Sequence, residues 1–130
     1  MHSKSFLIFL LILIVAIAKI NYLAEINYWY WEIRWFDWPM HFAGGVWLAG
    51  ITVWWRHLRH NDFPPQFHIL LRECLVFTII IGLGWEIFDG VLAFINKEQI
   101  NEIVDTTSDL FFDMLGGMTL AIFVWYGKHD

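Results

Sequence analysis

The 130-residue chain has few charged side chains. Asp, Glu, Lys and Arg make up only 16% of it, whereas a soluble domain carries about a quarter. Acidic residues outnumber basic ones, and the formal net charge is −5. No basic stripe is available to neutralise phosphates, so the composition argues against nucleic acid as a partner. The shortage of charge also argues against a soluble fold.

Cysteine is scarcer still, because Cys74 is the only one in the sequence. A single cysteine excludes an internal disulfide framework. Leu71, Leu75 and Val76 near it are apolar, and no histidine stands next to it to act as a base. We therefore expect a packed or lipid-facing thiol and not a reactive one.

Apolar and aromatic residues are abundant: 58% of the chain is hydrophobic, with nine Trp and twelve Phe. Four apolar stretches have roughly the 17–25 residues that a membrane crossing needs. They cover residues 5–23, 39–55, 67–94 and 105–126. The sequence therefore predicts an all-α fold, with residues 1–130 forming a single domain. This domain is an integral membrane bundle of four transmembrane helices.

The first of these stretches has a second interpretation. Lys4 precedes an apolar run, and Ala16-Ile17-Ala18 resembles a small-residue cleavage site, so residues 1–18 could be a cleaved signal peptide. The apolar character continues through Ile20 to Leu23, which favours a first transmembrane helix.

The connection between the first two stretches, residues 25–38, is dense in aromatic residues interspersed with charges. Such a composition suits an interfacial segment lying at the membrane surface. An ordinary aromatic belt at a helix end is the alternative interpretation.

The basic residues predict the orientation, since cytoplasmic loops carry an excess of Lys and Arg. With four spans, the side of the two termini and the second loop holds five of them, and the other side holds three. These are Lys4, Arg56, Arg59, Arg72 and Lys128 against Lys19, Arg34 and Lys97. We expect a multi-pass protein of the cytoplasmic (inner) membrane with both termini in the cytoplasm.

Acidic residues and one histidine gather at the opposite, outer end of the predicted spans. A charged side chain at the membrane centre costs about 2.5–3.5 kcal/mol even on the insertion scale. Buried carboxylates must therefore share protons, bind a cation or face water. We predict a divalent metal ion, Zn²⁺, Mn²⁺, Mg²⁺ or Ca²⁺, bound by His41, Glu86, Asp109 and Asp113. Asp37, Asp89 and Asp105 are expected around these ligands.

Some of these residues also have plain structural interpretations. Asp105 with Thr106 and Asp109 resembles a capping arrangement for the last helix. Asp37 could serve the positive end of the second helix, and His41 could be a hydrogen-bonded interior histidine. Asp113 and Glu86 are harder to explain in this way, because both interrupt apolar runs.

Glycines occur at the level of the acidic residues, and small residues let membrane helices approach closely. We expect helix packing at Gly44, Gly45, Gly82, Gly84, Gly116 and Gly117.

Three blocks of the sequence resemble the VanZ-like membrane proteins, and more closely their YjdF-type branch. They are Asp37-x-x-x-His41-Phe42, Gly82-x-Gly84-Trp85-Glu86-Ile87-Phe88 and Asp105-Thr106-x-x-Asp109-Leu110-x-x-Asp113-x-x-Gly116. The resemblance covers about the last ninety residues and implies a small multi-pass membrane protein. Asp113 stands where VanZ-like proteins have Asn, which weakens any transfer of the antibiotic-resistance role that names that family.

Three functions remain open from the sequence. The protein could bind a divalent cation and act on, or grip, a lipid or cell-envelope headgroup. It could be a proton- or cation-coupled transport protein. It could be an accessory membrane subunit whose polar cluster holds the helices together. Membrane lipids are the expected partners in each case, together with a second copy or partner membrane subunits.

Overall fold

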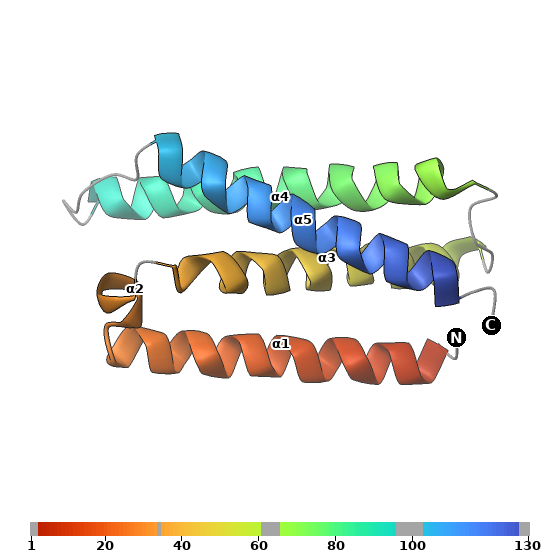
Figure 1. Ribbon diagram of the computed structural model, residues 1–130, viewed down its shortest axis with the longest axis horizontal. Helices are drawn as coiled ribbons and strands as arrows, with labels where there is room; N and C mark the ends of the chain where they lie inside the picture. Colours follow the sequence, from red (N-terminus) through yellow and green to blue (C-terminus); the bar gives the residue numbers. More distant parts are fainter. Residues whose placement is uncertain (1–2, 34, 61–65, 96–102, 128–130) are drawn as a thin grey trace.

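The computed structural model describes residues 3–33, 35–60, 66–95 and 103–127. The regular structure in these residues is entirely helical, without strands. It consists of α1 (Ser3–Ile26), the single turn α2 (Trp29–Glu32), α3 (Asp37–His60), α4 (Phe67–Ile95) and α5 (Ile103–Gly127) (Figure 1). Each long helix contains one of the four apolar stretches predicted from the sequence.

Local sequence explains where several helices begin and end. Pro39 lies in the first turn of α3, where its missing N–H leaves no hydrogen bond unmade. Between α1 and α2, Tyr28 adopts the left-handed conformation with φ 59° and ψ 32°, which separates the two helices. The turn is held by Tyr30 of α2, whose hydroxyl donates to Asn21 Oδ1 of α1 at 2.6 Å.

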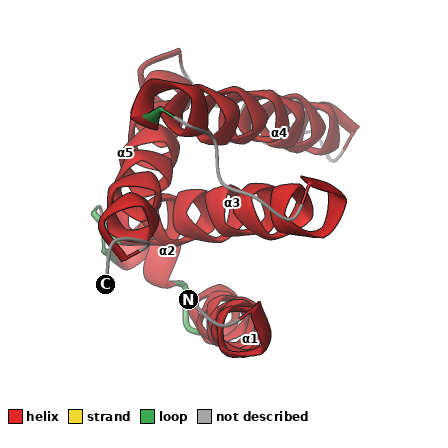
Figure 2. Cartoon of the chain, turned by 90° about the vertical axis from the view of Figure 1, so that its right-hand side faces the viewer, coloured by secondary structure: helices red, strands yellow, loops and turns green. Residues whose placement is uncertain are grey.

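The four long helices alternate in direction (Figure 1). α1 and α4 run away from the end that holds both chain termini, and α3 and α5 return towards it. α3 is central, since it contacts α1, α4 and α5. Seen end-on, α1 lies apart from the group formed by α3, α4 and α5 (Figure 2).

Three helical segments among the described residues are long and apolar enough to cross a membrane: Lys4–Ile26, Phe67–Ile95 and Thr106–Gly127. Many of their large apolar side chains point outward; Ile12 is 64% exposed and Ile87 and Phe123 are each 68% exposed. In water such a surface would be a large apolar patch, whereas lipid tails solvate it. α3 is outside this set, because glycines, histidines and tryptophans dilute its apolar character.

The apolar core lies in the half of the bundle that holds the termini. It is formed by Phe6, Leu10, Ala49, Val53, Leu70, Cys74, Leu120, Ala121 and Val124. Cys74 is fully buried, so the thiol is packed and not exposed.

α1 is attached to α3 by contacts that the sequence pattern did not reveal. Trp47 Nε1 donates to the backbone oxygen of Leu10 at 3.0 Å. Gly50 gives the Leu10 side chain room to lie directly against the α3 backbone.

Near the end of α3, an ion pair between Arg56 and Glu73 links α3 to α4.

Candidate functional site

The site is positioned by a close crossing of α3 and α5. A Cβ added to Gly45 would collide with the backbone oxygen of Asp113, and one added to Gly116 would collide with the backbone oxygen of Phe42. The two backbones therefore touch reciprocally, as small residues allow in membrane helices. His41 precedes Phe42, so this crossing brings the His41 and Asp113 side chains together.

His41 and Asp113 form the shortest contact of the cluster. His41 Nδ1 and Asp113 Oδ1 are 3.0 Å apart, within hydrogen-bond distance. The imidazole is 15% exposed and the Asp113 side chain 8% exposed. The other oxygen of Asp113 packs against Gly82 of α4, where a Cβ would lie 2.8 Å from Oδ2. The carboxylate is thus held on one side by His41 and on the other by a glycine.

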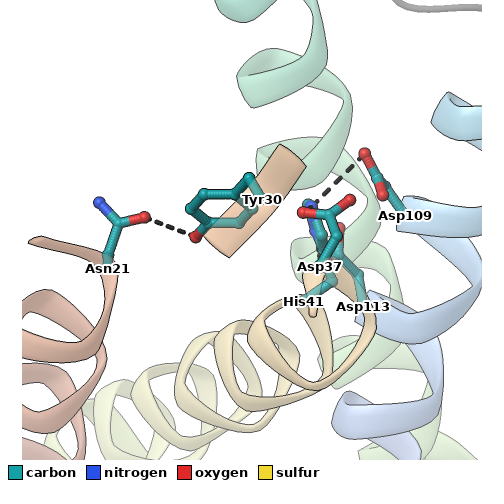
Figure 3. A network of polar contacts seen from close by, with 6 residues as sticks. All are labelled: Asn21, Tyr30, Asp37, His41, Asp109 and Asp113. Atoms are coloured by element: carbon teal, nitrogen blue, oxygen red, sulfur yellow. Dashed lines mark hydrogen bonds and ion pairs between the residues drawn. The ribbon is translucent and has the colours of Figure 1, made fainter. Parts of the chain in front are cut away.

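The second nitrogen of the imidazole faces two more carboxylates. His41 Nε2 lies 3.4 Å from Asp37 Oδ1 and 3.4 Å from Asp109 Oδ2. Asp37 is one turn before His41 on the same face of α3, and Asp109 is one turn before Asp113 on α5. Figure 3 shows the three carboxylates gathered around the ring of His41. One ligand atom from each of Asp37, His41 and Asp109 falls within 4.8 Å of the others.

Glu86 of α4 completes the cluster from the third helix. Its side chain interacts with Asp109 and lies within electrostatic range of His41 and Asp113. Its Oε2 is buried and, within the described residues, has no hydrogen-bond partner. Asp89, one turn further along α4, is exposed and interacts electrostatically with Glu86. The side chain of Asp105 lies outside the described part of the structure.

Aromatic side chains border the cluster. Trp38 of α3 stacks on Phe112 of α5, with ring centroids 5.4 Å apart and an interplanar angle of 13°. Tyr30 of α2 lies on the side that faces α1 (Figure 3). Burial, reinforced by the negative charges of Asp37 and Glu25, raises the pKa of Tyr30 to about 12. Tyr30 therefore remains a neutral phenol at physiological pH.

The structure brings the predicted ligands together but rearranges their order around the imidazole. Asp37, expected outside the ligand set, faces the same nitrogen as Asp109. Asp113, expected as a ligand, lies at hydrogen-bond distance from the other nitrogen, Nδ1. The reason is geometric. Residues four apart share a helix face, so Asp37 on α3 reaches Nε2 of the ring. Asp113 lies one turn further along α5 than Asp109 and meets Nδ1.

Of the predicted packing glycines, Gly45, Gly82, Gly116 and Gly117 lie against another helix. At Gly44 and Gly84 an added Cβ would meet nothing within 4 Å. Each lies close in sequence to a packed glycine but points in a different direction, since successive helical residues are rotated by about 100°.

These features define the class of the protein. Long apolar helices with outward-facing apolar side chains, able to span a bilayer, make it a membrane protein. The chain belongs to the family described as "Predicted membrane protein (DUF2238)", whose model matches residues 2–129. Comparison with curated proteins gives no match, and comparison with solved structures gives none either.

Proposed function

We propose that this protein binds a divalent cation at the end of the bundle where α3, α4 and α5 meet, and uses it to hold a lipid or cell-envelope headgroup. One observation carries the proposal: His41 Nε2 stands 3.4 Å from a carboxylate oxygen of both Asp37 and Asp109. A tetrahedral zinc ion bound at about 2.0–2.1 Å keeps its ligands about 3.3–3.4 Å apart. Both distances are thus those expected between zinc ligands, and one ligand atom from each of Asp37, His41 and Asp109 lies within 4.8 Å of the others.

The rest of the cluster fits this role. Asp113, on the Nδ1 side of His41, orients the ring in the way that carboxylates orient zinc-binding histidines. Glu86 interacts with Asp109 and has one buried oxygen without a hydrogen-bond partner in the described residues, so a further carboxylate lies next to the three ligands. A divalent cation would also offset two of the four carboxylates of the cluster, those of Asp37 and Asp109, around a neutral imidazole.

Zinc suits this donor set better than the harder cations. Imidazole is a common ligand of Zn²⁺, whereas Ca²⁺ and Mg²⁺ bind oxygen ligands. When bound, such a cation acts as a Lewis acid towards a phosphoryl oxygen. An anionic headgroup is therefore the substrate or ligand class that the site favours.

Titration of metal into the purified, chelator-treated protein tests this function. Trp38 stacks beside the cluster, so its fluorescence should respond to binding. We expect Zn²⁺ to bind more tightly than Mn²⁺ or Mg²⁺, and Asp109→Asn to weaken Zn²⁺ binding strongly. Glu25→Gln removes an exposed carboxylate of α1 and serves as the control. Equal Zn²⁺ affinity in all three proteins would rule out this site.

Transport is less well supported by the buried residues. Between the cluster and the terminal end, the described buried core contains only apolar residues and Thr78. A proton or cation path would need further ionisable groups there. A packing role is the stronger second candidate, since the reciprocal Gly45 and Gly116 contacts lie next to the His41–Asp113 pair. If the cluster only packs helices, Asp109→Asn should change stability and not metal binding.

We also propose that α3 is a fourth transmembrane span. α1 and α4 run in the same direction (Figure 1), so a chain that crosses the membrane in both must return between them. The 24 residues of α3 measure about 36 Å at 1.5 Å per residue, enough for a hydrocarbon core of about 30 Å. The excess of basic residues supports cytoplasmic termini and the inner membrane as the location.

Two finer assignments belong to the same proposal. The aromatic segment around α2 would lie at the outer interface, where tryptophan and tyrosine rings concentrate. The three sequence blocks that resemble VanZ-like and YjdF-type proteins contain Asp37, His41, Glu86, Asp109 and Asp113, so kinship with them would extend this cation site to those proteins.

A further inference from the structure

A hollow opens between α3 and α4 in the half of the bundle away from the acidic cluster. It has a volume of about 270 Å³ and is lined by Ile51, Thr52 and Trp55 of α3 and Phe77 of α4. We call it the α3–α4 hollow. Its lining is almost wholly apolar, and the one hydroxyl, that of Thr52, donates to the backbone oxygen of Leu48 at 2.9 Å. The hollow therefore favours an apolar ligand.

A cation stands one helical turn beyond the hollow. The guanidinium of Arg59 lies over the ring of Trp55, 5.8 Å from its centroid. Arg56, by contrast, is paired with Glu73 of α4. Among the ion pairs of the described residues, none engages Arg59. Arg59 is also exposed, so its guanidinium can meet an external anion at the end of α3.

The order of these features along α3 matches an amphiphile. An apolar hollow lies within the span, an aromatic ring forms its edge, and an arginine follows near the helix end. Basic side chains at such positions extend to the membrane interface and meet lipid phosphates. The volume falls just below the roughly 300–1,000 Å³ of sites that enclose a small molecule. It suits a segment of one chain and not a whole lipid.

We propose that the α3–α4 hollow binds part of an acyl chain of an anionic phospholipid, whose phosphate pairs with Arg59. The occupant comes from the surrounding bilayer, since the Trp55 ring at its edge is 56% exposed. The site needs no cation and shares no residue with the acidic cluster. It can therefore be tested independently of the metal.

Lipid titration of the full-length chain in neutral detergent, with chelator present, provides the test. Phosphatidylglycerol and phosphatidylcholine with identical acyl chains are compared by native mass spectrometry. We expect phosphatidylglycerol to bind more tightly. Arg59→Gln should lower its affinity about fivefold, since one arginine at an anionic surface contributes ~1 kcal/mol. Raising the salt concentration should reduce the difference in affinity between the two lipids, because salt screens the charge of Arg59.

Arg72→Gln is the matched control, because Arg72 is an exposed arginine at the same end of α4. It precedes Phe77 by five residues, so it lies about 140° around the helix from the hollow. Equal binding of the two lipids to the native chain would overturn the proposal. Equal losses of phosphatidylglycerol affinity in Arg59→Gln and Arg72→Gln would also overturn it, because the preference would then depend only on the total charge of the protein.

A second variant tests the hollow itself. Thr52→Phe fills it and should weaken both lipids, whereas Val76→Phe enlarges an exposed side chain of α4 that does not line the hollow. Native-like binding of both lipids by Thr52→Phe would show that the acyl chain lies elsewhere and would overturn the assignment.

Discussion

At the scale of single residues, the two nitrogens of His41 divide the cluster. Nδ1 is hydrogen-bonding distance from Asp113, and Nε2 faces Asp37 and Asp109. A proton on Nδ1, donated to Asp113, leaves the lone pair of Nε2 for a cation. The same imidazole, when protonated, would instead form ion pairs with all three carboxylates. A neutral His41 is therefore the state expected of a metal site, and a protonated His41 is the state expected of a cluster that only packs helices.

The members of the cluster could be predicted from the sequence, because His and carboxylates inside apolar runs are costly and therefore conspicuous. Their order around the ring could not. It depends on how deep α5 lies against α3, which is fixed by the backbone contact between Gly45 and Asp113. No spacing within one helix encodes that depth.

We predict different effects of the two aspartates on Zn²⁺ affinity. Asp113→Asn keeps an oxygen that accepts from Nδ1 but removes its charge, so affinity should fall by about 10–100-fold, as for other residues that orient a ligand. Asp37→Asn removes a direct ligand and should cost more. Calorimetric titration of both variants measures the two losses. A larger loss of Zn²⁺ affinity in Asp113→Asn than in Asp37→Asn would contradict this assignment and identify Asp113 as a direct ligand.

At the scale of helices, the crossing of α3 and α5 depends on which glycine of each pair faces the partner. Gly44-Gly45 and Gly116-Gly117 are visible in the sequence as sites of close approach. Rotation by about 100° per residue sends the members of a pair in different directions. Gly45 and Gly116 meet backbone of the opposite helix, Gly117 faces Thr78 of α4, and Gly44 meets nothing within 4 Å.

This arrangement predicts that Gly45→Ala destabilises the protein and Gly44→Ala does not. A methyl group on Gly45 would overlap the Asp113 backbone oxygen, and overpacking of this kind costs about 1–3 kcal/mol. At Gly44 the space is open, and alanine favours the helix by about 0.5–1 kcal/mol. Thermal unfolding in detergent compares the two. Equal melting temperatures would contradict the crossing.

At the scale of the whole molecule, hydropathy and span length predicted all four long helices. The central place of α3 was not predictable from them, because it rests on individual contacts such as Trp47 to Leu10 and Arg56 to Glu73. Those pairs join residues 37 and 17 positions apart, and nothing in the local pattern marks them as partners.

Four spans with cytoplasmic termini predict opposite locations for two exposed positions. In a Cys74→Ala background, a cysteine replacing Asn27 should react with a membrane-impermeant thiol reagent in intact cells. A cysteine replacing Gln66, which precedes α4, should react only after the cells are opened. Reaction of both from the same side would mean that α3 does not cross the membrane. The reverse pattern would invert the orientation.

Elemental analysis of the protein, purified in mild detergent without chelator, tests the central claim most directly. A zinc site of three protein ligands predicts about one ion per chain in the native protein. The metal should be lost in His41→Ala and Asp109→Asn and retained in the control Glu25→Gln. Native protein that carries no metal and takes up none when Zn²⁺ is supplied, while the variants fold normally, would contradict the cation site and leave the cluster as a helix-packing element.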